Sequence, residues 1–212
     1  MLSKLVSSFV GHLKPDRVTE RSTTTLALPP PELEGGEPLM RSLSRRRSGR
    51  TFQKTPLAPQ LLSNLLWAAF GMNRPETGDR TAPSALNAQE IDVYAALAGG
   101  LYVYAAKSHS LRLVAEVDAR RVTGYQDFVD EAPLDLIYVW DRAHTPIGAG
   151  DHHAIYAAVS VGAITQNVYL YCASAGLSTV ARAFFDHQAL ASALRLGKNE
   201  EVLLTQTVGY PG

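Results

Sequence analysis

A cluster of basic side chains with one hydroxyl is the most chemically suggestive part of the sequence. It reads Arg45-Arg46-Arg47-Ser48-Gly49-Arg50 and follows a short amphipathic stretch. Arginine forms paired, planar hydrogen bonds with phosphate oxygens, so several guanidiniums and a hydroxyl close together suit the binding of a phosphate group. Basic residues also favour the C-terminal end of a helix through its dipole. A solvated helix end therefore explains the cluster as well, if the cluster is taken alone.

A second candidate is a loop of small residues that ends in two amide side chains. It runs over 80–90 and contains Pro83, Ser84, Ala85, Asn87 and Gln89. Small residues let a backbone approach a flat ligand closely, and each amide offers both a donor and an acceptor. The edge of a flavin pyrimidine presents a matching alternation of carbonyl, N–H and carbonyl. The alternative is an ordinary turn in which both amides bond to the local backbone.

The third candidate segment, from Gly176 to Phe184, is expected to be a loop when taken by itself. Several common signatures are absent, among them the phosphate-binding glycine loops, the nucleophile elbow and the zinc-protease helix motif. His152 and His153 are adjacent, so on a helix they diverge by about 100° and make a poor metal pair. Cys172 stands in an apolar helical stretch and is expected to be a core residue. No metal site is therefore expected.

Apolar periodicity places these segments between helices and strands. A short helix is expected over 38–48, and a second helix begins at Pro59 and ends at Gly71. Residues 72–84 are expected to form a loop. Three antiparallel strands are expected next, over 90–97, 101–104 and 111–117. A central strand apolar on both faces follows over 134–140. The chain then continues with a long helix over 154–175, a shorter helix over 186–194 and a last strand over 202–208. Strands grouped between helices predict an α+β fold.

Length and composition limit the class of protein. The chain has 212 residues, of which 46% are hydrophobic and 19% charged, as in ordinary globular proteins. Residues 1–37 are expected to form an extended N-terminal arm, and residues 38–212 a single domain. The formal net charge is zero, which disfavours a nucleic-acid partner, and no apolar stretch is long enough to cross a membrane. The first residues make a poor signal peptide, so a cytoplasmic location is expected.

The long helix over 154–175 bears on assembly. Its apolar residues, among them Ile155, Val159, Ile164 and Val168, point in many directions. A chain of this size has little interior with which to cover such a helix, so a symmetric partner chain would supply the missing cover. A central helix wrapped by the chain's own sheet is the alternative. The residues alone leave the two arrangements open.

Taken in order, these segments resemble the nitroreductase family of FMN-dependent oxidoreductases over most of the chain. Arg46-Arg47-Ser48-Gly49-Arg50-Thr51-Phe52 resembles the family's opening Arg-x-Ser-x-(Arg/Lys)-x-Phe, and Pro83-Ser84-Ala85-Leu86-Asn87-Ala88-Gln89 resembles its amide loop. The helix over 162–170 with its exit Ala175-Gly176-Leu177, and the ending Val208-Gly209-Tyr210-Pro211, are similar to the central helix and last strand. The amide loop and the ending are most similar to the branch with the azole-forming peptide dehydrogenases.

This resemblance implies a nitroreductase-like α+β fold, with an antiparallel-rich central sheet flanked by helices, in an intertwined homodimer. It implies FMN at the subunit interface, with the phosphate held by Arg46, Arg47 and Ser48 and the pyrimidine side next to Arg50. Along the ring system, the resemblance implies five residues of the partner chain, namely Pro83, Ser84, Ala85, Asn87 and Gln89. Beside N5 it implies the segment of Val180, Ala181, Arg182, Ala183 and Phe184.

The implied activity is hydride transfer from NAD(P)H through flavin N5 to a small acceptor such as a nitroaromatic or a quinone. The flavin, and no side chain, then carries the chemistry. Two departures stand out. The family's Glu-Gly pair beside N5 corresponds to Ala183-Phe184, and further basic residues that many members carry after the Gly-Tyr-Pro ending are missing, which makes Arg182 an additional phosphate candidate.

Three alternatives remain at this point. The chain is also compatible with a flavin-dependent dehydrogenase that acts on a peptide or metabolite. The absent Glu-Gly pair leaves room for a non-catalytic flavin-binding module. A third class is a protein that docks an anionic partner through its arginine cluster.

Overall fold

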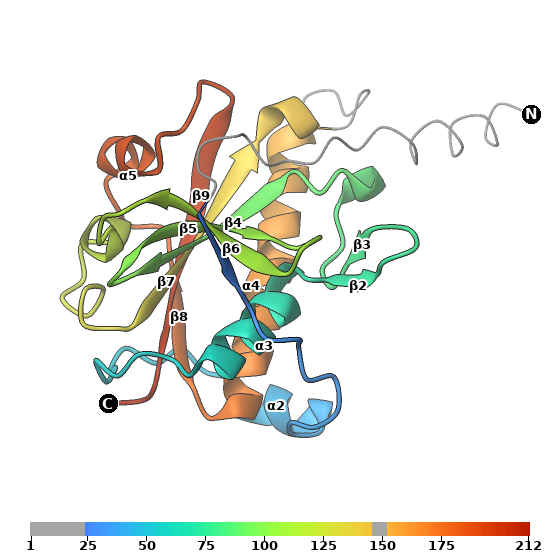
Figure 1. Ribbon diagram of the computed structural model, residues 1–212, viewed down its shortest axis with the longest axis vertical. Coiled ribbons are helices and arrows are strands. Elements are labelled where there is room, and N and C mark those ends of the chain that lie inside the picture. The colour runs from blue at the N-terminus through green and yellow to red at the C-terminus, as the bar shows by residue number, and fades with distance from the viewer. Residues whose placement is uncertain (1–23, 146–151) are drawn as a thin grey trace, which may run out of the picture.

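The computed structural model describes residues 24–145 and 152–212, and its centre is a seven-stranded antiparallel sheet (Figure 1). Neighbouring strands follow the order β1-β6-β5-β4-β7-β9-β8, and a separate hairpin pairs β2 with β3. The strands are β1 (Thr25–Ala27), β2 (Met72–Arg74), β3 (Asp79–Arg80), β4 (Ile91–Leu97), β5 (Gly100–Ala105), β6 (Ser110–Ala115), β7 (Leu134–Asp141), β8 (Ser178–Arg182) and β9 (Glu200–Gly209).

Helices cover both faces of this sheet, which confirms the predicted α+β fold. In the described residues they are α2 (Leu39–Arg45), α3 (Pro59–Phe70), α4 (His153–Ala175) and α5 (His187–Leu194). Buried side chains of α3 and α4, such as Leu65 and Ile164, share one core cluster with alternate residues of the strands. On the opposite face α5 packs through Leu190 and Leu194. The short 3₁₀ turns are Ala85–Asn87, Arg120–Thr123 and Arg142–His144.

Burial along the two middle strands agrees with the sequence pattern. Ile91, Val93 and Ala95 of β4 face α3 and α4, whereas Tyr94 and Ala96 face α5. The first seven residues of β7 are buried on both faces, and β7 lies between β4 and β9. The apolar run over 134–140 therefore forms a central strand as predicted, because both of its faces have helices to pack against.

Two segments that were expected to be loops contain strands. Residues 72–84 include the hairpin of β2 and β3, and residues 178–182 form β8, which pairs with β9 from Ser178↔Gly209 to Arg182↔Thr205. The loop predicted over 176–184 is therefore wrong. Since strand propensity depends strongly on the neighbouring strand, the free edge of β9 decides this conformation, and a local sequence does not show that edge.

The N-terminal segment, where the structure describes it, runs along the surface of the domain. Thr25–Ala27 extends the sheet beside β6. Side chains of α3 then bind the proline carbonyls, since Ser63 Oγ donates to Pro29 O at 2.5 Å and Gln60 Nε2 donates to Pro30 O at 2.9 Å. The rest of the predicted arm, residues 1–23, lies outside the described residues. The domain boundary at residue 37 stays a prediction.

α4 is buried on one side and exposed on the other. Ala157, Ile164 and Val168 are fully buried in the core with α3 and the sheet, whereas Ile155 and Val159 are 58% and 64% exposed. The chain's own sheet therefore covers only part of the apolar surface of this helix. In the described part of the chain, no helix has the length and hydropathy needed to cross a bilayer.

Candidate functional site

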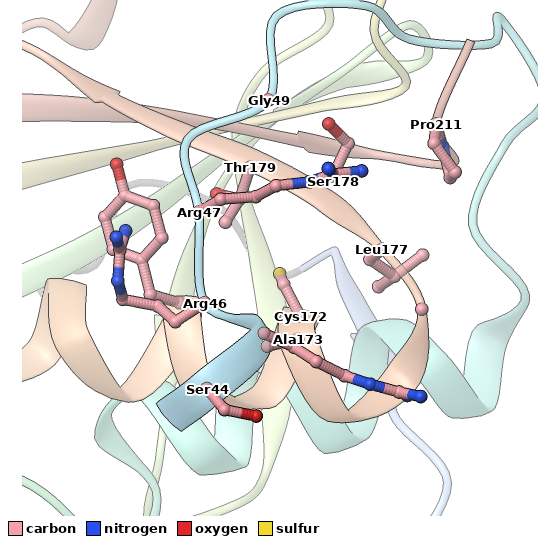
Figure 2. A pocket seen from close by; sticks show the side chains of 13 residues that line it. Ser44, Arg46, Arg47, Gly49, Cys172, Ala173, Leu177, Ser178, Thr179 and Pro211 are labelled. Carbon is pink, nitrogen blue, oxygen red and sulfur yellow. The ribbon is translucent and has the colours of Figure 1, made fainter. Parts of the chain in front are cut away.

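A cavity of about 510 Å³ opens where the end of α2, the C-terminal half of α4 and the start of β8 meet (Figure 2). α2 ends at Arg45, and the extended segment after it passes beside Ser178 and Thr179 of β8. The residues that line the cavity are Ser44, Arg45, Arg46, Arg47, Gly49, Tyr169, Cys172, Ala173, Gly176, Leu177, Ser178, Thr179 and Pro211.

Backbone contacts fix the segment after α2 against β8 and the C-terminal residues. Gly49 N donates to Thr179 O at 2.9 Å, and Phe52 pairs with Pro211 as an isolated bridge. A Cβ at Gly49 would come within 2.0 Å of Ser178 Oγ, so a side chain there would require the Ser178 hydroxyl to rotate away. The arginine motif and the Gly-Tyr-Pro ending, which are far apart in the sequence, are thus brought together.

Three of the predicted phosphate residues gather beside the cavity. Arg46 and Arg47 line it, and Ser48 follows directly. Arg45 also lines it, but its Nη1 donates to Glu37 Oε1 at 2.9 Å, so its charge is partly neutralised. Among the described residues, no acidic side chain pairs with Arg46 or Arg47. Their positive charge therefore makes this end of the cavity suitable for an anion.

Tyr169 is a site residue that the sequence did not single out. Its Oη accepts a hydrogen bond from Ala181 N at 2.9 Å and lies 2.9 Å from Ser48 Oγ. The guanidinium of Arg46 lies over its ring, with Cζ 5.3 Å from the ring centroid. The sequence offers no sign that distinguishes it from Tyr171, which bonds to α3 instead. The two tyrosines differ only in the direction in which their side chains project from the helix.

The amide loop lies elsewhere on the same chain, and no residue of 83–89 lines the cavity. Gln89 Nε2 donates to Asn87 Oδ1 at 2.8 Å, and Asn87 Nδ2 donates to Asp79. Leu86, Asn87 and Gln89 have left-handed φ values of 51°, 54° and 52°, which is strained for residues with a side chain. Within one chain, local groups therefore bind both amides, as in the simpler of the two interpretations.

The rest of this loop is closer to the solvent. Pro83 is exposed, and Ser84 and Ala85 are half-buried, with Ser84 Oγ accepting a hydrogen bond from Gln89 N at 2.9 Å. Arg50 is also exposed and does not line the cavity. One copy of the chain thus joins the arginine segment to β8 and Tyr169, but it does not join the arginine segment to the amide loop.

Arg182 has a different role from the one expected. It is buried, its Nη2 lies 2.6 Å from Asp135 Oδ1, and its Nη1 donates to Thr123 O at 2.7 Å. Burial raises the pKa of Asp135 to about 6 and lowers the pKa of Arg182. The opposite charge of the partner shifts each pKa in the other direction, but by less than burial does. The guanidinium is committed to this core network, so the expectation that it helps to hold a phosphate is wrong.

The other residues from 180 to 184 differ in exposure. Val180 is only 3% exposed, so its side chain belongs to the core. Ala181 is half-buried on the edge strand, and Ala183 is exposed. Phe184 is 68% exposed, and its ring centroid lies 4.7 Å from that of Tyr125. Along this segment a ligand would therefore meet backbone and small side chains first, and an exposed aromatic pair at the far end.

Cys172 lines the cavity but is only 1% exposed. Burial raises the pKa of its thiol, so the reactive thiolate is disfavoured. This placement agrees with the predicted core role. In the part of the chain that the structure describes, no group of three or more His, Cys, Asp or Glu side chains is arranged to hold a metal ion.

Comparisons with known proteins match most of the chain to one family. The sequence model of the nitroreductase family matches residues 43–210. A protein of Methanocaldococcus jannaschii is 32% identical over 157 residues, which cover 69% of this chain and 79% of its own. A crystal structure from Ralstonia eutropha JMP134 is 42% identical with a TM-score of 0.85, covering 95% of this chain and 96% of its own. Both carry the name "putative nitroreductase".

The fold extends to more distant proteins. A chain of the E. coli microcin synthetase complex, solved with a truncated precursor bound, has a TM-score of 0.72 at 19% identity over 97% of this chain and 87% of its own. That likeness concerns the fold alone. The family match spans the arginine segment, α4 and β8, which all contribute residues to the lining of the cavity. The chain therefore belongs to the nitroreductase family.

Proposed function

We propose that the chain is an FMN-dependent oxidoreductase that uses NAD(P)H to reduce a small acceptor such as a nitroaromatic or a quinone. Membership of the nitroreductase family supports an oxidoreductase. The observation that carries the finer proposal is the gathering of Arg46, Arg47 and Ser48 at a cavity bordered by the edge strand β8. This combination offers a cationic end for a phosphate and a line of backbone for a flat ring.

The donor set at the cavity suits the phosphate of FMN. Arg46 and Arg47 supply charge without an acidic partner among the described residues, and Ser48 supplies a hydroxyl. Guanidinium–phosphate hydrogen bonds are strong and paired, and both arginines line the cavity. Gly49 allows the segment to lie directly against Ser178, which holds these donors beside β8.

A second copy of the chain completes the proposed site. Ile155 and Val159 leave an apolar strip of α4 exposed, and a symmetric partner would cover it. Pro83 and Leu86 of the amide loop are exposed and therefore accessible to such a partner. In the proposed intertwined homodimer, each FMN lies between the arginine segment of one copy and the loop over 83–89 of the other.

When bound, FMN supplies the redox chemistry, namely hydride acceptance at N5 from NAD(P)H and delivery of reducing equivalents to the acceptor. Arg50 stabilises negative charge at the pyrimidine edge in this proposal. Two unit charges at 4 Å attract by about 4 kcal/mol at an effective dielectric of about 20. The backbone of Val180 to Ala183 orients the ring system. Ala183 provides no carboxylate, so no side chain is assigned as a general acid or base.

The test is an FMN titration of the purified protein, followed by NADH and NADPH oxidation with menadione as the acceptor. We expect the absorption of a bound flavin, saturable binding, and turnover above that of free FMN. Arg46→Ala should weaken FMN binding by about 1.5–3 kcal/mol, the range for hydrogen bonds to a charged group. A protein that stays colourless after incubation with FMN would overturn the proposal.

Two other outcomes would favour the alternatives. FMN binding without NAD(P)H oxidation above that of free flavin would indicate a non-catalytic flavin-binding module. Turnover of a peptide or metabolite without NAD(P)H would indicate a dehydrogenase whose flavin is reoxidised by oxygen. A cytoplasmic location stays a prediction and is checked by fractionation of the cells that make the protein.

A further inference from the structure

The phenolic oxygen of Tyr169 contacts two parts of the candidate site, the edge strand β8 and the arginine segment. Its Oη lies 2.9 Å from Ala181 N on β8 and 2.9 Å from Ser48 Oγ on the segment after α2. Tyr169 itself comes from α4 and lines the cavity. The segment after α2 thus meets α4 and β8, which are far from it in the sequence, at one hydroxyl group.

The number of protons limits the direction of each hydrogen bond. The backbone N–H of Ala181 can only donate, so Tyr169 Oη accepts there. A phenolic oxygen has one hydrogen to give, and among the described residues only Ser48 is placed to receive it. The 2.9 Å separation allows either oxygen to be the donor, and donation from Tyr169 to Ser48 Oγ is the arrangement that uses the phenolic hydrogen within the protein. The hydrogen of the Ser48 hydroxyl is then free to be donated to a further group.

This orientation selects the kind of ligand that Ser48 can bind. A hydroxyl that accepts a hydrogen bond is polarised and becomes a better donor. Ser48 is exposed, and the Arg46 guanidinium lies over the same tyrosine ring, with Cζ 5.3 Å from the ring centroid. Donated hydrogens and positive charge thus occur at the same place, which favours an anion with several acceptor oxygens and disfavours a cation.

We propose that Tyr169 is a positioning residue for phosphate recognition: it orients Ser48 as a donor to a phosphate monoester and supports Arg46 beside it. The inference rests on the proposed function, in which this phosphate is that of FMN. The bond to Ala181 also ties the phosphate end to β8, so Tyr169 sets the position of the phosphate relative to the strand that borders the ring.

The chain provides a matched control for this residue. Tyr171 is on the same helix and is also half-buried, but its Oη reaches Leu61 O only at 3.4 Å and it does not line the cavity. Tyr169→Phe and Tyr171→Phe each remove one hydroxyl and keep the ring. Comparison of FMN with riboflavin, which lacks the phosphate, separates an effect on phosphate recognition from an effect on the whole site.

We expect Tyr169→Phe to weaken FMN binding on the order of 5-fold, as for one hydrogen bond, and to leave riboflavin binding unchanged. Tyr171→Phe should change neither. In the Ser48→Ala background, Tyr169→Phe should weaken FMN binding less than in the wild type, because the hydroxyl that it orients is gone and only the bond from Ala181 N is lost. Equal weakening of FMN and riboflavin, or full additivity in the double variant, would overturn the proposal.

The experiment also distinguishes this inference from the proposed function. If the wild-type protein bound neither flavin, the proposed function would fail, and titration with inorganic phosphate followed by ³¹P NMR would then decide the inference. We expect weaker phosphate binding in Tyr169→Phe than in Tyr171→Phe. Equal phosphate binding in the two variants, or none in the wild type, would overturn the role of Tyr169.

Discussion

Arg182 and Asp135 form an ion pair under the edge strand β8, with 2.6 Å between Arg182 Nη2 and Asp135 Oδ1. Their side chains are 4% and 0% exposed. The same guanidinium donates to Thr123 O and to Thr207 Oγ1, each at 2.7 Å. One side chain thereby joins β7, β8, β9 and the turn over 120–123. The strand that borders the candidate site is held in place by this network.

Removal of one member of the pair should be strongly destabilising. Arg182→Met leaves Asp135 as a buried carboxyl group without its partner, so we expect the free energy of unfolding to fall by about 3–5 kcal/mol. In Arg182→Met/Asp135→Leu the loss should be smaller than the sum of the two single losses. Urea denaturation followed by the fluorescence of Trp67 and Trp140 measures each value. Additive losses would mean that the two residues do not stabilise each other.

The buried carboxyl group should also give the stability a characteristic pH dependence. Burial raises the pKa of folded Asp135 to about 6 from an ordinary value of 3.8. Between these values the native state holds a proton that the unfolded chain has lost, so this group adds stability at low pH and the addition is lost as the pH rises through about 6. The Asp135→Asn variant has no carboxyl group at this position, so it lacks this pH-dependent contribution to stability. The unfolding free energy of the wild type minus that of Asp135→Asn should therefore increase as the pH falls from about 7 to 4, and a constant difference would contradict the raised pKa.

Gly49 should resist substitution because of one contact. A Cβ at this position would come within 2.0 Å of Ser178 Oγ but 3.3 Å from Ser178 Cβ. We expect Gly49→Ala to lower the unfolding free energy by about 1–3 kcal/mol through overpacking. Gly49→Ala/Ser178→Ala should recover most of this loss, since it removes the clashing oxygen. A double variant no more stable than Gly49→Ala, in the same thermal melts, would show that the backbone of Gly49 sets the cost.

His109 should make the stability depend on pH in the opposite direction. Ser63 gives its one hydrogen to Pro29 O, so His109 donates from Nε2 to Ser63 Oγ at 2.7 Å and accepts at Nδ1 from Tyr104 Oη at 2.8 Å. A neutral ring accepts at Nδ1 in this way, and burial favours the neutral form because it lowers the pKa of His109 below 6.5. As the pH falls through about 6.5, the unfolded chain takes up a proton first, and stability is lost.

The comparison variant is His109→Gln, which has no titrating ring. Its unfolding free energy should fall less than that of the wild type as the pH is lowered from about 7 to 5. Limited proteolysis over the same range should cut the segment 24–37 of the wild type more readily at low pH, because Ser63 and His109 anchor it through Pro29. Identical slopes in the two proteins would show that His109 does not contribute.

The spacing of apolar residues was sufficient to predict the helices and strands whose conformation depends on their own residues. Both ends of α3 were predicted, since Pro59 starts the helix and Gly71 follows its last turn. The central position of β7 followed from its two apolar faces. β8 was missed because its conformation depends on pairing with β9, and the short hairpin of β2 and β3 was missed because its five residues show no alternation.

The candidate site required more than local sequence. The arginine segment was recognised from its side chains, but its position beside Pro211 depends on tertiary contacts. Arg182 was misjudged because its acidic partner lies 47 residues away in the chain. Tyr169 and Tyr171 are both helical tyrosines separated by about 200° around the axis, and only the packing of α4 decides which of them lines the cavity.

The exposed strip of α4 should control both assembly and cofactor binding. Ile155 and Val159, one helical turn apart, are 58% and 64% exposed, and in the proposed dimer a partner would cover them. We expect the wild type to sediment as a dimer and Ile155→Glu/Val159→Glu to sediment as a monomer, because burial of two charges without partners is unfavourable. FMN affinity should fall at the same time, since the loop over 83–89 would no longer be supplied by the partner. Val117→Glu, at a 45% exposed position after β6, is the control and should stay dimeric. A double variant that remains a dimer with unchanged FMN affinity would place the interface on another surface.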